Sequence, residues 1–305
     1  MKPALAQRPG VTGDGADRTT PEAAFGLVAD ETRFRILRAL WDAFTDGDGT
    51  VSFSALRERA DVDDSGRFNY HLDQLTPRFV RQRTTGYELT YAGKQVVGAA
   101  VSGVYTAADS RSVDPMPVGD CPDCEGRLEA SYETGVITVA CADCEQVVAR
   151  PRAPPVLAAS YDDAELPAVF GRRTLATVRE MNAGFCHLCG GRVTRALHTP
   201  VDEIENDGPV AIVYSCEACG RRVDAGVGAV LLSHPGVVAF LHDNGVDLRE
   251  TPLWELLWVV DPPIRVVSED PLELAVTVPA DGEEFVATLD GSLSVQAYSR
   301  SDREE

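Results

Sequence analysis

Residues 121–128 read Cys-Pro-Asp-Cys-Glu-Gly-Arg-Leu, and residues 186–193 repeat this pattern as Cys-His-Leu-Cys-Gly-Gly-Arg-Val. A second Cys-x-x-Cys pair follows each copy after a strand-like run, first Cys141 with Cys144 and then Cys216 with Cys219. The two pairs are separated by 16 residues in the first copy and by 26 in the second. Two thiolates three positions apart on a tight turn can reach one tetrahedral ion, so this spacing predicts two zinc-ribbon-like β modules.

We predict two structural zinc ions per chain. Their ligands fall into two sets of four, Cys121, Cys124, Cys141 and Cys144, then Cys186, Cys189, Cys216 and Cys219. A four-cysteine site is coordinatively closed, so it stabilises folding and leaves no position for catalysis. Gly126 and Gly191 are expected to supply the positive φ that each turn needs. His187 lies inside one turn as a competing ligand, although Cys189 makes it unnecessary. An iron–sulfur cluster or redox-active thiols are the alternatives to zinc.

The rest of the C-terminal region predicts further helices and an antiparallel meander. Residues 166–182 have helical periodicity, with Gly184 as the residue that ends the helix. A helix is expected from Ser233 to Leu241, and a short one then carries Trp254 and Trp258 as core residues, with a ligand pocket as the alternative. The meander strands are expected at 272–278, 285–289 and 293–297. The predicted domains are a first module at 120–152, a connecting helix region at 153–184, a second module at 185–224, a helix plus sheet at 225–299 and a tail at 300–305.

The N-terminal third predicts a small helical domain with one hairpin. Residues 1–19 are rich in Gly, Pro and Asp without periodicity and are expected to be a disordered tail. Capping signals and apolar periodicity then predict helices from about residues 21 and 31 and over 53–60, 65–75 and 92–104, with a β-hairpin at 79–90. This order over residues 20–105 predicts a winged helix-turn-helix, with a linker at 106–119. The fold class is therefore α+β: the winged helix, two zinc-ribbon-like β modules with intervening helices, and a C-terminal antiparallel meander.

The helix at 65–75 carries the candidate residues for binding DNA. At 100° per residue Phe68, Leu72 and Leu75 share an inward face, and polar side chains occupy the rest. A helix in the major groove contacts bases mainly through its N-terminal residues, which favours Arg67, Asn69 and Tyr70. The full candidate set is Ser65, Arg67, Asn69, Tyr70, His71 and Gln74, with Arg81 and Arg83 on the hairpin. For His71, the competing interpretation is a hydrogen bond at the edge of the core. For the whole domain, the competing interpretation is that it contacts only other proteins.

Four segments of this third resemble a known family. They are Asp30-Glu-Thr-Arg-Phe-Arg-Ile-Leu37, Phe53-Ser-Ala-Leu56, Phe68-Asn-Tyr-His-Leu-Asp-Gln-Leu75 and Gly86-Tyr-Glu-Leu-Thr90. Together they are similar to the ArsR-type winged helix-turn-helix of haloarchaeal transcriptional regulators over about residues 20–105, and the cysteine-bearing remainder looks like the C-terminal domains attached to such regulators. The resemblance implies a dimeric regulator that binds operator DNA. Residues 1–120 contain no cysteine, so arsenic-type sensing in this domain is unsupported.

Composition favours a cytoplasmic protein of a halophile. The 305 residues hold 48 acidic and 28 basic side chains, and only Lys2 and Lys94 are lysine. A densely carboxylated surface keeps proteins soluble in multimolar salt, although an acidic face for a basic partner is the alternative. No apolar stretch approaches the roughly 18 residues of a membrane span, and the N-terminus lacks the apolar core of a signal peptide, so we expect no membrane contact.

These observations favour a sequence-specific transcription regulator that binds double-stranded DNA as a homodimer. The helix at 92–104 carries an apolar stripe that is long for one small domain, so it is the expected dimer helix, with ordinary core packing as the alternative. Transcription machinery or a small effector are further candidate partners. Two functions compete with this one. The first is a protein-interaction adaptor, and the second is a redox- or metal-responsive regulator that uses the Cys-x-x-Cys pairs. An enzyme is not expected, because no nucleophile–base motif or phosphate-binding glycine loop is present.

Overall fold

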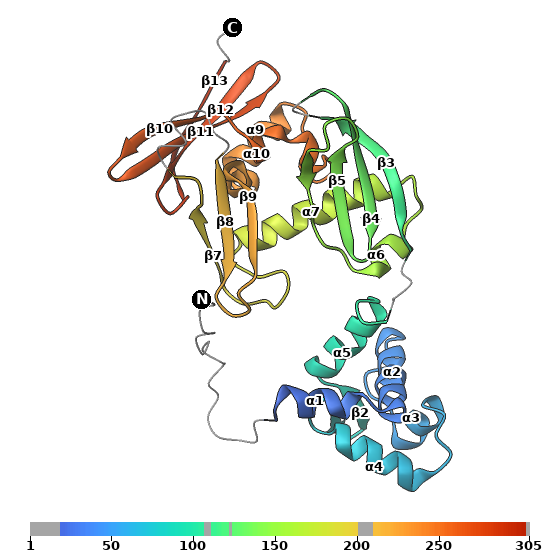
Figure 1. Ribbon diagram of the computed structural model, residues 1–305. Helices are drawn as coiled ribbons and strands as arrows, with labels where there is room; N and C mark the ends of the chain where they lie inside the picture. Colours follow the sequence, from blue (N-terminus) through green and yellow to red (C-terminus); the bar gives the residue numbers. More distant parts are fainter. Residues whose placement is uncertain (1–18, 107–110, 122–123, 201–209, 303–305) are drawn as a thin grey trace, which may run out of the picture. The chain divides into compact units, whose positions relative to one another are not determined.

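The computed structural model describes residues 19–106, 111–121, 124–200 and 210–302 (Figure 1). They divide into two compact units: an N-terminal unit of residues 19–106 with 154–157, and a C-terminal unit of the described parts of residues 111–153 and 158–302. The predicted α+β class with several antiparallel sheets is confirmed. The predicted tail at 1–19 lies outside the described residues except for Thr19. Within the described ranges, no helix combines the length and the apolar character that crossing a membrane requires.

The N-terminal unit contains five helices and a hairpin among its described residues. They are α1 (Pro21–Val28), α2 (Glu31–Thr45), α3 (Phe53–Arg59), α4 (Ser65–Leu75), β1 (Val80–Arg83), β2 (Gly86–Leu89) and α5 (Tyr91–Val101). Every helix follows a capping Thr, Ser or Asp whose side chain accepts the backbone N–H three residues ahead, so the sequence signals do define these starts. Helix α5 ends at Val101, earlier than the predicted residue 104.

Apolar side chains of α2, α3 and α4 form the core of this unit. Ile36 and Leu37 of α2 are fully buried, as is Leu56 of α3. Phe68 of α4 is also fully buried, and its ring meets Phe53 of α3 edge-on with centroids 5.0 Å apart. Burying each large apolar side chain contributes about 1.5–3 kcal/mol. Helix α4 is therefore fixed by one face, which leaves its other side free for contacts with a ligand.

The first sheet of the C-terminal unit corrects a boundary. Its strands are antiparallel and adjacent in chain order: β3 (Val113–Asp120), β4 (Arg127–Glu133), β5 (Val136–Cys141) and β6 (Val147–Ala149). The linker predicted at 106–119 is wrong from residue 113, because β3 pairs with β4 there. Pro115 and Pro117 gave the appearance of a linker. An edge strand tolerates proline because its outer N–H groups need no partner, and the ladder shifts register around both prolines.

Helix α7 links the first sheet to the second. It spans Leu166–Asn182, as predicted, and follows the short α6 (Pro155–Ala159). Near its start Phe170 stacks on Tyr132 of β4, with ring centroids 6.0 Å apart. At its end Asn182 accepts a hydrogen bond from the Tyr214 hydroxyl at 2.6 Å and donates one to the Ala229 carbonyl at 2.7 Å. Gly184 follows with φ +87°, which confirms it as the residue that ends the helix.

The second sheet and the C-terminal meander share one hydrophobic core. The second sheet comprises β7 (Val193–Leu197), β8 (Ala211–Cys216) and β9 (Arg222–Gly226). The connecting elements are η1 (Val227–Ser233), α9 (Pro235–Asp243), η2 (Leu253–Glu255) and α10 (Leu257–Val260). Trp254 and Trp258 lie on two separate short helices rather than one, and both are buried as predicted. Ile212 of β8, Phe240 of α9 and Phe285 of the meander belong to the same core, so the predicted regions 185–224 and 225–299 fold together.

The meander has one strand more than predicted and reaches further toward the C-terminus. Its strands are β10 (Ile264–Glu269), β11 (Leu272–Ala280), β12 (Glu283–Asp290) and β13 (Val295–Asp302), adjacent in that order. The predicted tail at 300–305 is wrong as far as residue 302, because Asp302 still pairs with Glu283 of β12. Strand β10 was missed because Pro262 and Pro263 immediately before it obscure the strand pattern.

Candidate metal centres and an exposed polar helix face

All four Cys-x-x-Cys pairs lie on the same tight turn. The first cysteine of each pair donates its N–H to the carbonyl oxygen five residues ahead, at 2.6–2.9 Å. Its own carbonyl accepts the N–H four residues ahead, at 2.8–3.2 Å. These turns begin at Cys121, Cys141, Cys186 and Cys216. The sequence repeat is therefore also a repeat of backbone geometry.

The positive φ in these turns occurs one residue earlier than predicted. It belongs to the fourth residue after the first cysteine, with φ +58°, +62°, +71° and +73° at Glu125, Glu145, Gly190 and Gly220. The expectation that Gly126 and Gly191 supply it is wrong. They are close-approach positions: a Cβ at Gly191 would lie 2.7 Å from the Ala218 Cβ, and one at Gly126 would overlap the Asp143 carboxylate.

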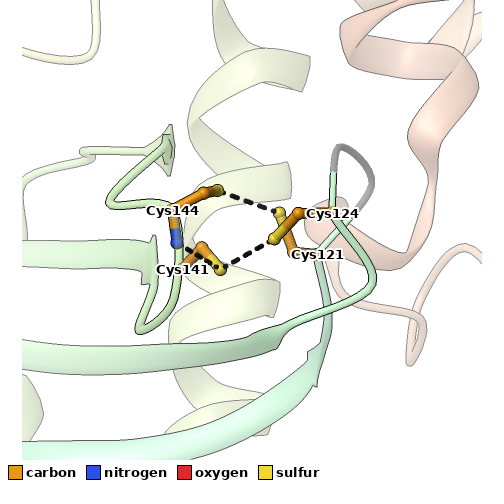
Figure 2. Close-up of side chains that lie close together, drawn as sticks. All are labelled: Cys121, Cys124, Cys141 and Cys144. Carbon is orange, nitrogen blue, oxygen red and sulfur yellow. Dashed lines mark hydrogen bonds between the residues drawn. The ribbon is translucent and has the colours of Figure 1, made fainter.

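Each repeat brings its four sulfur atoms together. In both sets every Sγ lies within 4.8 Å of the others, so the structure confirms two four-cysteine clusters able to hold a metal ion. Figure 2 shows the first cluster, where Cys121 faces Cys144 with Sγ atoms 3.7 Å apart and Cys124 faces Cys141 at 3.6 Å. The corresponding distances in the second are 3.8 Å and 3.6 Å.

These distances fit a tetrahedral ion with four thiolate ligands. A tetrahedron with Zn–S bonds of about 2.3 Å has S–S edges of about 3.8 Å. A disulfide would need sulfur atoms about 2.05 Å apart, much closer than the 3.6–3.8 Å of these pairs. The donor set is complete without His187, which belongs to neither cluster. Burial, then the nearby charges of Arg221 and Arg173, lower the pKa of His187.

Backbone N–H groups favour the thiolate form of Cys141 and Cys216, the first cysteine of the second pair in each cluster. The Cys144 and Asp143 N–H groups point at the Cys141 Sγ at 3.4 and 3.3 Å, and lower the pKa of Cys141 to about 7. The Cys219 N–H lies 3.5 Å from the Cys216 Sγ and is the main cause that lowers the pKa of Cys216 to about 6. Since the thiolate is the ligand form, these N–H groups favour metal binding by Cys141 and Cys216.

Hairpin pairing puts the two turns of a cluster opposite each other. Leu128 pairs with Cys141 in the first sheet, and the equivalent Val193 pairs with Cys216 in the second. The first cysteine of every pair is buried and the second is exposed. Sequence reasoning missed Asp143, whose carboxylate accepts the Arg127 N–H at 3.0 Å and joins the two turns of the first cluster. Its position directly before Cys144 was the available signal.

Helix α4 presents most of its candidate DNA-binding residues to solvent. Phe68, Leu72 and Leu75 are buried as predicted. Ser65, Arg67, Asn69, Tyr70 and Gln74 are exposed. Arg67 donates to the Thr32 hydroxyl at 3.3 Å, and Asn69 donates to the Asp73 carboxylate at 2.9 Å. Neither contact buries the polar group that makes it.

His71 does not share this exposed face. It is 8 % exposed, and its Nδ1 lies 3.4 Å from the Asp30 carboxylate, which also caps α2. Its inclusion among the DNA-contacting candidates is contradicted by this burial. The competing interpretation, a polar contact at the edge of the core, describes its position.

The hairpin arginines are exposed and share one carboxylate. Arg81 and Arg83 lie on β1, and both face Glu88 of β2. The Arg83 guanidinium lies 2.7 Å from the Glu88 carboxylate, whereas Arg81 lies 3.9 Å from it. One carboxylate cannot neutralise two guanidinium groups, so the hairpin keeps a positive charge.

The apolar stripe of α5 is buried at Val97 and exposed from Val101 onward, beyond the end of the helix. Val97 is fully buried in the core of its own unit, so it cannot contribute to a dimer surface. Val101, Val104 and Tyr105 are 44 %, 58 % and 76 % exposed, and Phe25 of α1 is 66 % exposed. Among the residues that the structure describes, the exposed part of this stripe therefore begins at Val101.

Comparison with known proteins identifies two family models. One, described as a domain of unknown function (DUF7351), matches residues 118–295, and it covers both cysteine clusters. A second, described as a domain of unknown function (DUF7347), matches residues 21–100. Searches of the curated proteins and of the solved structures find no match.

Proposed function

The chain belongs to the DUF7351 family through residues 118–295, and we propose that its N-terminal unit, which precedes that domain, binds duplex DNA so that the protein acts as a transcription regulator. The proposal treats the N-terminal unit as a winged helix-turn-helix in which α3 and α4 form the motif and the β1–β2 hairpin is the wing. Helices α2, α3 and α4 followed by a two-stranded antiparallel hairpin are the order that this motif requires.

The exposed face of α4 is the observation that carries this proposal. Arg67, Asn69 and Tyr70 lie near its N-terminus and are exposed, while the opposite face is anchored in the core. Arginine recognises guanine and asparagine recognises adenine by paired hydrogen bonds in the major groove. The arginines of the hairpin lie on the adjacent element, where a wing contacts phosphates.

Salt strengthens the case for direct contacts to bases. The acidic composition favours a protein that works in multimolar salt, where the Debye length is only about 3 Å and attraction to phosphates falls steeply. Specific binding then depends on hydrogen bonds in the groove more than on backbone attraction. Helix α4 provides such donors and acceptors.

Zinc is the metal that we propose for both cysteine clusters. Four thiolates at tetrahedral spacing suit zinc, and the closed ligand set leaves no position for a substrate. The role is structural: each ion ties together the two turns of its cluster.

A second copy of the chain is the proposed partner of the exposed apolar side chains on α1 and around the end of α5. Val101, Val104 and Phe25 are exposed there, although apolar side chains of this size gain about 1.5–3 kcal/mol from burial. A dimer would also present two α4 helices to the two halves of a palindromic site.

Duplex selection followed by binding measurements tests the proposed function. Wild-type protein first selects its preferred site from a random duplex library, and anisotropy in molar KCl then compares this site with a scrambled duplex. Arg67→Ala and Asn69→Ala should each reduce the preference by about 1–3 kcal/mol, roughly 5- to 150-fold. Arg81→Ala and Arg83→Ala should weaken both duplexes alike and flatten the salt dependence.

Two matched variants separate recognition from folding. Thr32→Val removes the hydrogen bond that Arg67 donates without changing charge, and Arg300→Ala makes the same charge change in the C-terminal unit. Both should retain wild-type preference. If Arg67→Ala and Asn69→Ala retain it too, α4 does not read the sequence and the proposal is wrong.

A further inference from the structure

The two metal-binding tips have opposite charge although their turns have the same geometry. Residues 121–128 and 141–148 hold one arginine against four carboxylates, whereas residues 186–193 and 216–223 hold three arginines against Glu217 alone. The acidic positions of the first copy are neutral in the second: Asp123, Glu125, Asp143 and Glu145 correspond to Leu188, Gly190, Ala218 and Gly220. Gln146 and Val147 correspond to Arg221 and Arg222. Apart from the cysteines, the side chains of the second tip therefore carry a net positive charge within the most acidic part of the chain.

The arginines of the second tip are largely unpaired. Arg192 has only a loose partner, since its Nε lies 3.8 Å from the Glu217 carboxylate and its side chain is 78 % exposed. Among the described residues no carboxylate lies within 4.0 Å of Arg221 or Arg222. In the first tip the one arginine, Arg127, is held by Glu129 at 2.7 Å. Positive charge is thus available only on the second tip.

Two large apolar side chains are exposed beside these arginines. Phe185 is 57 % exposed and Leu188 is 69 % exposed. Phe185 forms an isolated antiparallel bridge with Arg192, and the Arg192 carbonyl accepts the Glu217 N–H from the opposite turn at 3.0 Å. These contacts join both turns, and we call the group formed by the exposed Phe185, Leu188, Arg192 and Arg222 with the half-buried Arg221 the basic tip.

We propose that the basic tip binds single-stranded nucleic acid, with Phe185 stacking on a base while the arginines contact neighbouring phosphates. Base stacking on an aromatic ring is tolerant of sequence and does not depend on long-range charge, so it persists where salt screens phosphate attraction. Leu188 extends the apolar surface next to the ring. The closed metal cluster beneath holds both turns rigidly and so positions the surface.

Single strands fit this surface better than other anionic partners do. A duplex hides the faces of its bases, so Phe185 would find nothing to stack on. An acidic polypeptide would match the arginines but would leave Phe185 and Leu188 in water. The inference concerns the C-terminal unit and does not depend on the role of α4.

Fluorescence anisotropy with labelled oligo(dT) and oligo(U) of 20 nucleotides tests the proposal on the full chain. Phe185→Ala should weaken binding roughly 5- to 150-fold, and exposure of the ring makes this substitution compatible with folding. The double substitution Arg192→Gln with Arg222→Gln should reduce the slope of log K against log salt by about 1.4, since each phosphate contact on a single strand contributes about 0.7. Arg127→Gln on the first tip is the matched control and should change neither quantity. Comparing the affinity for oligo(dT) with that for oligo(U) shows whether the tip prefers single-stranded DNA or single-stranded RNA.

Three results would overturn the proposal. They are wild-type affinity in the Phe185 variant, a loss of duplex affinity in that variant as large as its loss of oligo(dT) affinity, and equal affinity of the wild-type protein for polyglutamate. Metal content and circular dichroism of each variant establish that the tip is still folded. Arg67→Ala, which tests the proposed function, should leave oligo(dT) binding unchanged, so failure of one proposal is distinguishable from failure of the other.

Discussion

Gly191→Ala should weaken metal binding at the second cysteine cluster while the first cluster keeps its ion. A Cβ at this position would lie 2.7 Å from the Ala218 Cβ and 3.2 Å from the sulfur atoms of Cys189 and Cys216. Carbon atoms in contact lie about 3.5–4.0 Å apart, so the two turns must separate by roughly 0.8 Å. Metal–ligand distances tolerate only about 0.2 Å. Overpacking of this kind costs about 1–3 kcal/mol, which corresponds to roughly 5- to 150-fold in zinc affinity.

Competition with a chromogenic chelator measures this effect. Wild-type protein should release two equivalents of zinc to the chelator. Gly191→Ala should release one equivalent at a much lower chelator concentration than the wild-type protein does. Gly190→Asn is the matched control: its Cβ meets no atom within 4 Å, its φ is +71°, and asparagine tolerates that conformation. Two tightly held ions in Gly191→Ala, or equal loss in Gly190→Asn, would refute the reasoning.

Two further expectations concern assembly and stability. Val101→Asp should give monomers in light scattering at high salt, because it places a charge in the exposed apolar surface. Val97→Asp should instead unfold the N-terminal unit, because Val97 is fully buried. A monomeric wild-type protein would contradict the proposed dimer. Tyr214→Phe should cost about 1–2 kcal/mol in urea unfolding, since it leaves the Asn182 oxygen without its donor. Burial raises the pKa of Tyr214, so the folded protein keeps a proton that the unfolded chain releases above about pH 10. The stability from this tyrosine is therefore full below pH 10 and declines as pH rises, and Tyr214→Phe should show a smaller decline between pH 8 and pH 11; identical declines would contradict this.

Patterns with one physical cause were predictable from the sequence. Helix α7 has a long apolar period, and Gly184 adopts the positive φ that ends it. The cysteine spacing predicted both clusters, because two ligands three residues apart on a turn leave few other arrangements. The buried face of α4 followed from Phe68, Leu72 and Leu75 in the same way.

Positions with two competing causes were not predictable. Pro115 and Pro117 occur in linkers and in edge strands alike, and only the pairing with β4 distinguishes the two. A glycine at 126 or 191 is compatible both with a positive φ and with close packing against a neighbouring turn, and the sequence does not distinguish the two. The stripe on α5 contains Val97 and Val101 one turn apart, and periodicity does not tell which packs in its own core.

Helix α7 makes the C-terminal unit one cooperative structure rather than two independently folded domains joined by a linker. Its 17 residues span about 25 Å, with Phe170 stacked on the first sheet near one end and Asn182 bonded to the second sheet at the other. Heating that frees either end removes contacts which hold the other, so both duplicated halves should melt in a single transition. A fragment cut between the cysteine repeats would expose one half of this helix to water. Duplication of the metal-binding hairpin thus produced a single folding unit, in which neither copy is a separable domain.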